Sequence, residues 1–401
     1  MIVEHLQTLI RKYPFYGTEG LLSAQKYIKD HLEKSKWDRV FLDTYQASDI
    51  SGDKRYVAVH EFGSPYDNYQ DVEKYNVVAI KDGGLPGPTV ILNGHVDVDI
   101  VDESRSWLHD QGWKSGIMQD GKLYGRGAAD MLGGLSCQMA CASRFIDHNP
   151  CFKGRLIFTS VCDEEIGGNG TLRSLLLLEE EVLITPGSLA VIAEPSENKV
   201  CLDSLGFMHF VIECSRTPLH MGIAEPDNNA LNSINHLISN FELIMQEFIE
   251  SRGLSEFKNL FKFNFGKIKG GIDPAIPIGN ITLEGTIFFP DIVTDVEIFM
   301  SLQKVIEPQF GLSIRLGEFG FPGASFTNNL KSYFSSLEQG IFPSPCDARL
   351  FKSFGIMAAI WGPGSLRQAH SINEFIHIED LLQYESTFYQ WLCQTLGTSH
   401  G

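Results

Sequence analysis

Residues 89–98 read TVILNGHVDV, a short apolar and β-branched run that ends on a histidine. Such a run is typical of a strand that is buried on both faces of a sheet. His95 therefore follows the strand directly, at the carboxyl end, where open α/β sheets place their ligands. Asp97 is spaced so that its carboxylate can accept the second imidazole N–H and orient the ring. For an isolated pair at this spacing, a capped histidine in a loop is the commoner interpretation.

The same arrangement recurs at three further apolar runs. RLIFTSV (155–161) leads into Asp163, Glu164 and Glu165, LAVIA (189–193) ends at Glu194, and GIMAAIWG (355–362) precedes His370. Of two adjacent glutamates that leave a strand, one can ligate a metal while the other faces bound water as a general base. Three acids in a row are otherwise typical of a solvated loop. Four candidates on the carboxyl side of four strands nevertheless indicate one shared site.

Asp130 has a different setting. It lies in YGRGAADM (124–131), immediately before a helical pattern. The small residues around it allow close approach of the backbone, and a carboxylate there can bridge two ions. The alternative is a simple helix N-cap, a position that Asp favours.

Together these residues match the ligand set that two divalent ions require. His95 and His370 supply imidazoles, and Asp130, Glu165 and Glu194 supply carboxylates, which suit hard-to-borderline cations. Two divalent ions against three carboxylates leave one positive charge, which a bridging hydroxide would neutralise. Such a site makes that nucleophile at neutral pH, so the pattern predicts hydrolysis.

The order of helical and strand patterns predicts two domains. Strands and helices alternate up to residue 206, which favours an α/β domain with a mostly parallel sheet and helices on both faces. Residues 207–320 change to antiparallel-type strands with two long helices, and the first pattern resumes over 321–401, beginning with a helix at 327–339. We therefore expect a domain of residues 1–206 and 321–401 with an inserted α+β domain of 207–320.

Composition narrows the partners and the compartment. The 401-residue chain carries a net charge of −18, which argues against nucleic acid or an anionic membrane as a partner. No window approaches about 18 uninterrupted apolar residues, the length a membrane-spanning helix needs. The N-terminus lacks a signal-peptide pattern, and the eight cysteines show no CxxC pair. We expect a cytoplasmic protein with reduced thiols.

Several stretches of the chain resemble one enzyme superfamily. They are HVDV (95–98), GRGAADM (125–131), DEEIGG (163–168), EPS (194–196) and AHSINEF (369–375). In order and spacing they resemble the co-catalytic zinc peptidases and deacylases, which include acetylornithine deacetylase, succinyl-diaminopimelate desuccinylase and aminoacylase. The resemblance covers essentially the whole chain.

The resemblance assigns roles to the candidates. It implies that His95, Asp130 and Glu194 hold one zinc ion and that Asp130, Glu165 and His370 hold the other. Glu164 would be the general base and later the proton donor to the leaving amine, and Asp97 would orient His95. The resemblance also implies a cis peptide bond between Asp130 and Met131. Cobalt or manganese could replace zinc.

The inserted domain resembles the lid and dimerisation domain of this superfamily. LHMGIAEPDNNALNSI (219–234) contains His220, which the resemblance implies reaches a substrate carbonyl, in many members from a partner subunit. CDAR (346–349) contains Arg349, which the resemblance pairs with a substrate carboxylate, a bidentate task suited to arginine. On the residues alone, a loop histidine is the commoner interpretation of His220, and for Arg349 a surface arginine and a substrate-binding arginine are equally common.

Three positions depart from the superfamily pattern. Leu132 stands where a lysine is usual, the loop before a lid strand reads GGIDPAIP (270–277), and Phe289-Pro290 replaces an arginine at the strand end. These departures leave the substrate open. We expect a dizinc amidohydrolase that removes an N-acyl group from an amino-acid-like substrate, with an exopeptidase or dipeptidase acting on short peptides as the alternative. A catalytically silent metal-binding or scaffold protein is a third hypothesis.

Overall fold

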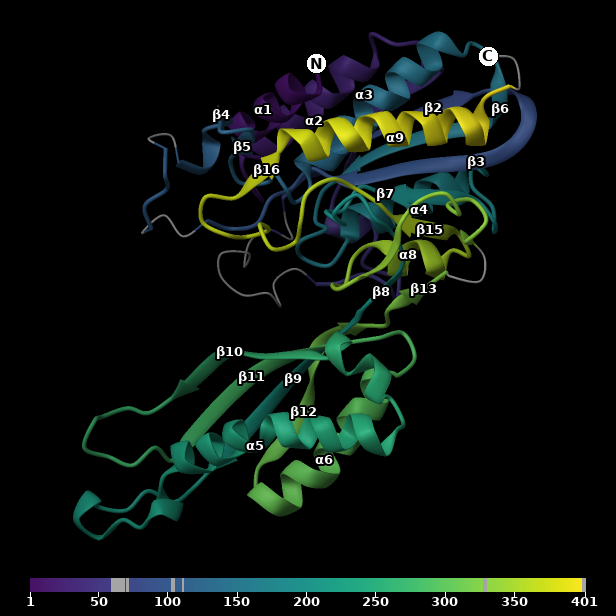
Figure 1. The fold of residues 1–401 in the computed structure, drawn as a ribbon. Helices are drawn as coiled ribbons and strands as arrows, with labels where there is room; N and C mark the ends of the chain where they lie inside the picture. Colours follow the sequence, from purple (N-terminus) through teal and green to yellow (C-terminus); the bar gives the residue numbers. More distant parts are fainter. Residues whose placement is uncertain (59–68, 70–71, 102–104, 110–111, 327–329, 399–401) are drawn as a thin grey trace. The chain divides into compact units, whose positions relative to one another are not determined.

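The computed structural model describes residues 1–58, 69, 72–101, 105–109, 112–326 and 330–398. These residues form two compact units (Figure 1). The first contains Met1–Asp203, Phe326–Phe342 and Cys346–Gly401, and the second contains Ser204–Ser325 and Pro343–Pro345. The division into two units says nothing about the role of residues 207–320. Their function as a lid and dimerisation domain therefore stays a prediction.

The first unit is built on a mixed sheet. In spatial order its strands are β1 (Arg39–Tyr45), β2 (Lys74–Asp82), β6 (Phe152–Val161), β3 (Gly84–His95), β7 (Leu189–Ile192), β15 (Met357–Ile360) and β8 (Val200–Ser204), with β14 (Gln339–Phe342) paired to β8. The four strands β6, β3, β7 and β15 pair in parallel. The pairings of β1 with β2, β2 with β6 and β15 with β8 are antiparallel. Parallel pairing is thus confined to the centre of the sheet.

Helices cover both faces of this sheet (Figure 1). One layer contains α1 (Ile2–Lys12), α2 (Glu19–Leu32), α3 (Leu132–His148) and α9 (Ile378–Leu396), and the other contains α4 (Asn169–Glu180) and α8 (Ala348–Ser353). Cover on both faces explains why Val90, Ile91 and Leu92 of β3 are all fully buried, as a continuous apolar run requires. The predicted α/β class is confirmed.

Shorter elements complete both units. A small antiparallel sheet contains β4 (Ile117–Gln119), β5 (Lys122–Tyr124) and β16 (Phe375–His377). The remaining short elements are η1 (Ala47–Asp49), η4 (Gly112–Lys114), η5 (Met221–Ile223), η6 (Pro226–Asn228), η7 (Ser255–Leu260) and β13 (Ala324–Ser325). Among the residues described, no helix combines the length and the apolar character needed to cross a membrane.

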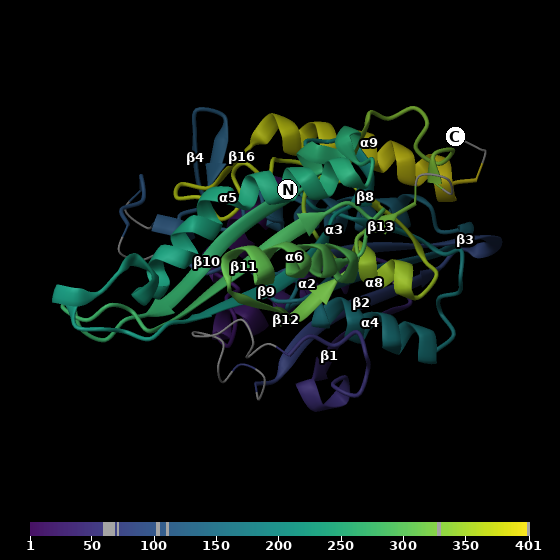
Figure 2. The same ribbon diagram turned by 90° about the horizontal axis from the view of Figure 1, so that it is seen from below.

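The second unit has a four-stranded antiparallel sheet covered by two helices (Figure 2). Its strands in order are β10 (Lys262–Gly270), β11 (Asn280–Phe289), β9 (Gly206–Ser215) and β12 (Ser313–Phe321), and its helices are α5 (Ala230–Ser251) and α6 (Asp295–Phe310). Burial alternates along β11, as expected for a sheet with one covered face. Thr294 and Glu297 form a capping box at the start of α6, a common helix-starting arrangement.

The expected helix over 327–339 differs from the structure. Residues 327–329 lie outside the described residues, residues 331–336 form turns, and β14 begins at Gln339. The buried side chains of Leu330 and Phe334 explain the helix-like spacing, since an apolar pair four residues apart also suits a turn that packs on a core.

Gly134 in α3 offers a test of the packing of this helix. A Cβ there would lie 2.1 Å from the carbonyl oxygen of Ala193. Gly134→Ala should lower the free energy of unfolding by about 1–3 kcal/mol, although helix propensity alone favours Ala by about 1 kcal/mol. Gly52→Ala is the control, because its Cβ would meet nothing within 4 Å. Denaturant unfolding measures both variants, and a Gly134→Ala protein as stable as the control would contradict this packing.

Candidate metal centre

The parallel strands bring the predicted ligands to one edge of the first unit's sheet. His95 is the last residue of β3 and pairs in register with Val161, the last residue of β6. Glu165 follows β6, Glu194 follows β7 and His370 follows β15. Because parallel strands end at the same edge, these side chains emerge close together. Asp130 reaches them from the turn that precedes α3.

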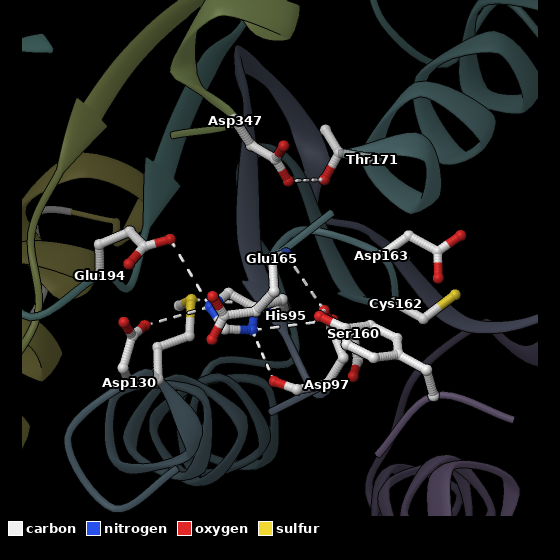
Figure 3. Close-up of polar contacts among 12 residues, drawn as sticks. His95, Asp97, Asp130, Ser160, Cys162, Asp163, Glu165, Thr171, Glu194 and Asp347 are labelled. Atoms are coloured by element: carbon white, nitrogen blue, oxygen red, sulfur yellow. Dashed lines mark hydrogen bonds and ion pairs between the residues drawn. The ribbon is translucent and has the colours of Figure 1, made fainter. Parts of the chain in front are cut away.

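The five predicted ligands form two groups that share Asp130. Figure 3 shows the first group, with Asp130 and Glu194 both directed at the ring of His95. His95 Nε2 lies 3.3 Å from Asp130 Oδ1 and 3.7 Å from Glu194 Oε1. His370 Nε2 lies 3.0 Å from Glu165 Oε2 and 3.6 Å from Asp130 Oδ2. The two carboxylate oxygens of Asp130 therefore face different histidines, which is the arrangement a bridging ligand needs.

Glu164 lies within the same cluster. The donor atoms of His95, Glu164 and Glu194 lie within 4.8 Å of one another, as do those of His95, Asp130 and Glu165. This separation of at most 4.8 Å is compatible with both roles expected of such a glutamate, as a metal ligand or as a general base.

The crowding of carboxylates shows that the donor set suits cations. Burial, followed by the charges of Glu194 and Asp347, raises the pKa of Glu164 well above its usual value. Burial, followed by the charge of Asp130, likewise raises the pKa of Glu194. Carboxylates in this setting repel one another unless a positive charge lies between them. Imidazole and carboxylate donors that converge here are those that bind zinc and similar divalent ions.

Asp97 contacts His95 differently from the simplest expectation. The nearest acceptor to His95 Nδ1 is the main-chain oxygen of Asp97 at 2.9 Å, whereas its carboxylate Oδ1 is 3.7 Å away. The other carboxylate oxygen accepts hydrogen bonds from the Tyr16 hydroxyl at 3.0 Å and from the Glu165 main-chain N–H at 3.2 Å. Asp97 thus links the ring of one ligand to the backbone of another.

Tyr16 was not among the residues predicted from the sequence. It lies between α1 and α2, far from every strand-end motif, and its ring packs against Tyr69. Nothing in the local sequence distinguishes it from a core tyrosine, and only the fold reveals its contact with Asp97.

Arg349 is held beside the loop that carries Glu164 and Glu165. Its Nη2 donates a hydrogen bond to the carbonyl oxygen of Gly167 at 2.6 Å. Burial lowers the pKa of Arg349, and the charge of Asp347 opposes this effect. Asp347 in turn accepts a hydrogen bond from Thr171 at 2.5 Å. Recognition of a substrate carboxylate by Arg349 stays a prediction.

Two further predictions concern the backbone and the second unit. The peptide bond between Asp130 and Met131 is cis, as the resemblance implied. His220 belongs to the second unit, where it is exposed and its Nδ1 accepts a hydrogen bond from the Gly222 N–H at 3.2 Å. Its predicted contact with substrate stays a prediction.

Curated relatives of this chain are deacylases by name. It is 24% identical to an N-formyl-4-amino-5-aminomethyl-2-methylpyrimidine deformylase of Bacillus subtilis (strain 168), over 91% of this chain and 95% of the relative. It is 25% identical to a succinyl-diaminopimelate desuccinylase of Rickettsia akari (strain Hartford), over 78% of this chain and 85% of the relative.

Solved structures share the fold. An M20 family metallo-carboxypeptidase, Sso-CP2 from Sulfolobus solfataricus, matches with a TM-score of 0.69 and 16% identity over 98% of both chains. Human carnosine dipeptidase 1 matches with a TM-score of 0.68 and 15% identity, over 98% of this chain and 96% of that one.

The model of the family described as Peptidase family M20/M25/M40 matches residues 91–394. This match spans every predicted ligand, from His95 to His370, and it confirms the superfamily resemblance seen in the sequence. The chain belongs to peptidase family M20/M25/M40 and is a metal-dependent hydrolase of amide or peptide bonds.

Proposed function

We propose that this protein is a dizinc amidohydrolase that removes an N-acyl group from an amino-acid-like substrate. The observation that carries the proposal is that the two carboxylate oxygens of Asp130 face different histidines. Its Oδ1 lies 3.3 Å from His95 Nε2, and its Oδ2 lies 3.6 Å from His370 Nε2. The names of the Bacillus and Rickettsia relatives, a deformylase and a desuccinylase, support removal of an acyl group over cleavage between amino acids.

In this proposal the five ligands divide between two ions. His95 and Glu194 would hold one, Glu165 and His370 would hold the other, and Asp130 would be shared between them. Bound divalent ions would polarise the substrate carbonyl and lower the pKa of a bound water molecule. Zinc suits this donor set, and cobalt or manganese could occupy it as well.

Glu164 moves the proton in the proposed reaction. Its carboxylate accepts a proton from water as the water oxygen forms a bond to the acyl carbon. It then donates that proton to the amine nitrogen as the C–N bond breaks, so that a carboxylic acid and a free amine result. The half-buried position of Glu164, within 4.8 Å of the donor atoms of His95 and Glu194, supports this role.

Three finer points belong to the same proposal. Arg349 binds the carboxylate of the amino-acid part, since a guanidinium matches that group in a bidentate manner. The second unit acts as a lid and as the contact of a homodimer, with His220 reaching a substrate carbonyl. The enzyme works in the cytoplasm. The resemblance of residues 219–234 and 346–349 to lid and arginine segments supports the first two points.

A substrate panel tests the reaction. The protein is depleted of metal with a chelator, reloaded with zinc or cobalt, and assayed with N-formyl, N-acetyl and N-succinyl amino acids beside dipeptides. We expect hydrolysis of an acyl amino acid that vanishes on depletion and returns on reloading. Preference for dipeptides would replace the deacylase with the exopeptidase, and activity that survives complete metal removal would reject both. A loaded protein inactive on the whole panel would favour the silent scaffold.

Glu164→Gln separates proton transfer from metal binding. The amide keeps the shape of the side chain but cannot accept the proton. We expect kcat to fall by about 10²–10⁴-fold, while metal content measured by mass spectrometry stays at the level of the unmodified protein. Near-normal turnover would exclude Glu164 as the base, and loss of metal would make it a ligand.

Thermal unfolding tests the bridging role of Asp130. A ligand that binds only the folded state at about 100 times its Kd stabilises it by about 2.7 kcal/mol. Zinc added to metal-depleted protein should therefore raise Tm clearly, and Asp130→Asn should abolish most of this rise. Asp82→Asn, which removes an exposed carboxylate on β2, should retain it. Equal zinc responses of the two variants would contradict the bridging role.

A further inference from the structure

Asp130 and His370 lie in irregular segments that the parallel strands do not position directly. Asp130 lies in the turn before α3, and His370 lies in the long connection between β15 and β16. The side chain of His370 is 46% exposed, so packing around it does little to hold it in place. The parallel sheet alone therefore does not fix the distance between these two ligands.

A buried ion pair joins the two segments. Arg126 Nη1 donates to Glu374 Oε2 at 2.7 Å, and the two side chains are 4% and 0% exposed. The other oxygen of Glu374, Oε1, accepts hydrogen bonds from the main-chain N–H groups of Ala129 at 2.9 Å and Asp130 at 3.2 Å. Both oxygens of Glu374 thus accept hydrogen bonds from the chain itself.

Arg126 completes the connection to the second segment. Its Nη2 donates to the main-chain oxygen of His370 at 3.1 Å and to that of Ile100 at 3.3 Å. One ion pair therefore holds the backbone N–H of Asp130 at one end and the backbone carbonyl of His370 at the other. A planar guanidinium presents several donors in a fixed geometry, which suits it to hold two acceptors at once.

The small antiparallel sheet explains why these two residues meet. Tyr124, the last residue of β5, pairs with Phe375, the first residue of β16. The Gly125 N–H extends this pairing by donating to the Glu374 main-chain oxygen at 2.9 Å. Arg126 and Glu374 therefore lie just beyond a strand pair that sets their register.

We propose that Arg126 and Glu374 are positioning residues for the metal centre: they hold the backbones of Asp130 and His370 at the separation that lets both histidines face one carboxylate. The proposal rests on the proposed function, since it assigns these residues to the two-ion site. The ion held by Glu165 and His370 depends on both irregular segments. The ion held by His95 and Glu194 shares only Asp130 with these segments, and its other two ligands adjoin β3 and β7, so breaking the pair should affect this ion less.

Zinc titration by calorimetry of metal-depleted protein tests this. Glu374→Gln keeps the length of the side chain but removes its charge, and Arg126→Lys keeps a charge but loses the planar geometry. Each should weaken the zinc ion that we assign to Glu165 and His370 by about 10–100-fold, as loss of a residue that orients a ligand typically does. The other ion, which shares only Asp130 with the two segments, should weaken by less. The double variant Arg126→Lys, Glu374→Gln should lose about as much as either single change, because the two residues act as one unit.

The matched control is another ion pair of the same unit. Arg173 and Asp43 pair at 2.8 Å between α4 and β1, and Asp43 is 8% exposed. Asp43→Asn breaks this pair and should leave both zinc affinities unchanged. Circular dichroism at the titration temperature establishes that each variant is folded, and Arg126→Lys provides the measurement should Glu374→Gln not fold.

The outcomes are separable. Unmodified protein that binds no zinc would reject the proposed function itself. Two zinc ions in the unmodified protein with unchanged affinities in the Arg126 and Glu374 variants would overturn the positioning role alone. An equal loss in Asp43→Asn would also overturn it, because that result would report general destabilisation.

Discussion

The parallel pairing of β3 with β6 and β7 is the constraint on which the site depends. The register places His95 opposite Val161 and Asn93 opposite Ile192, so that three strands finish together at one edge. Parallel strands require long crossover connections, and here those connections contain α3 and α4. The polar residues that follow each strand consequently meet in space although up to 99 positions separate His95 from Glu194 in the chain.

This convergence brings several carboxylates close together, and the rest of the site must offset their mutual repulsion. Glu164, Glu165 and Glu194 emerge at one edge of an apolar sheet, and burial raises the pKa of each, that of Glu165 to about 7. A buried carboxylate is costly unless a cation or hydrogen-bond donors surround it. His95 and His370 supply part of the compensation, and divalent ions would supply the remainder. The family's metal dependence thus follows from where the strands end.

Sequence patterns predicted the parts of the site that are local to strand ends. His95 and Glu194 adjoin buried apolar runs, and both lie at the expected edge of the sheet. Contacts that depend on tertiary structure were not predicted. The Tyr16 hydroxyl reaches Asp97 across 81 positions of sequence, and Glu374 carries no signal that it binds the Asp130 backbone. The strand β1 was also missed, since RVFLDTY has only a partly buried face and no clean periodicity.

The positions that depart from the superfamily pattern differ in what surrounds them. Leu132 is fully buried and lies close to Gly127, so that a lysine in its place would need a partner for a buried charge. Phe289 is also fully buried, where it packs near Gly206 at the end of β11. The loop 270–277 is the opposite case, because Ile272 is 91% exposed. Leu132 and Phe289 therefore pack within their own units. The side chains of the exposed loop 270–277 are instead free to contact another molecule.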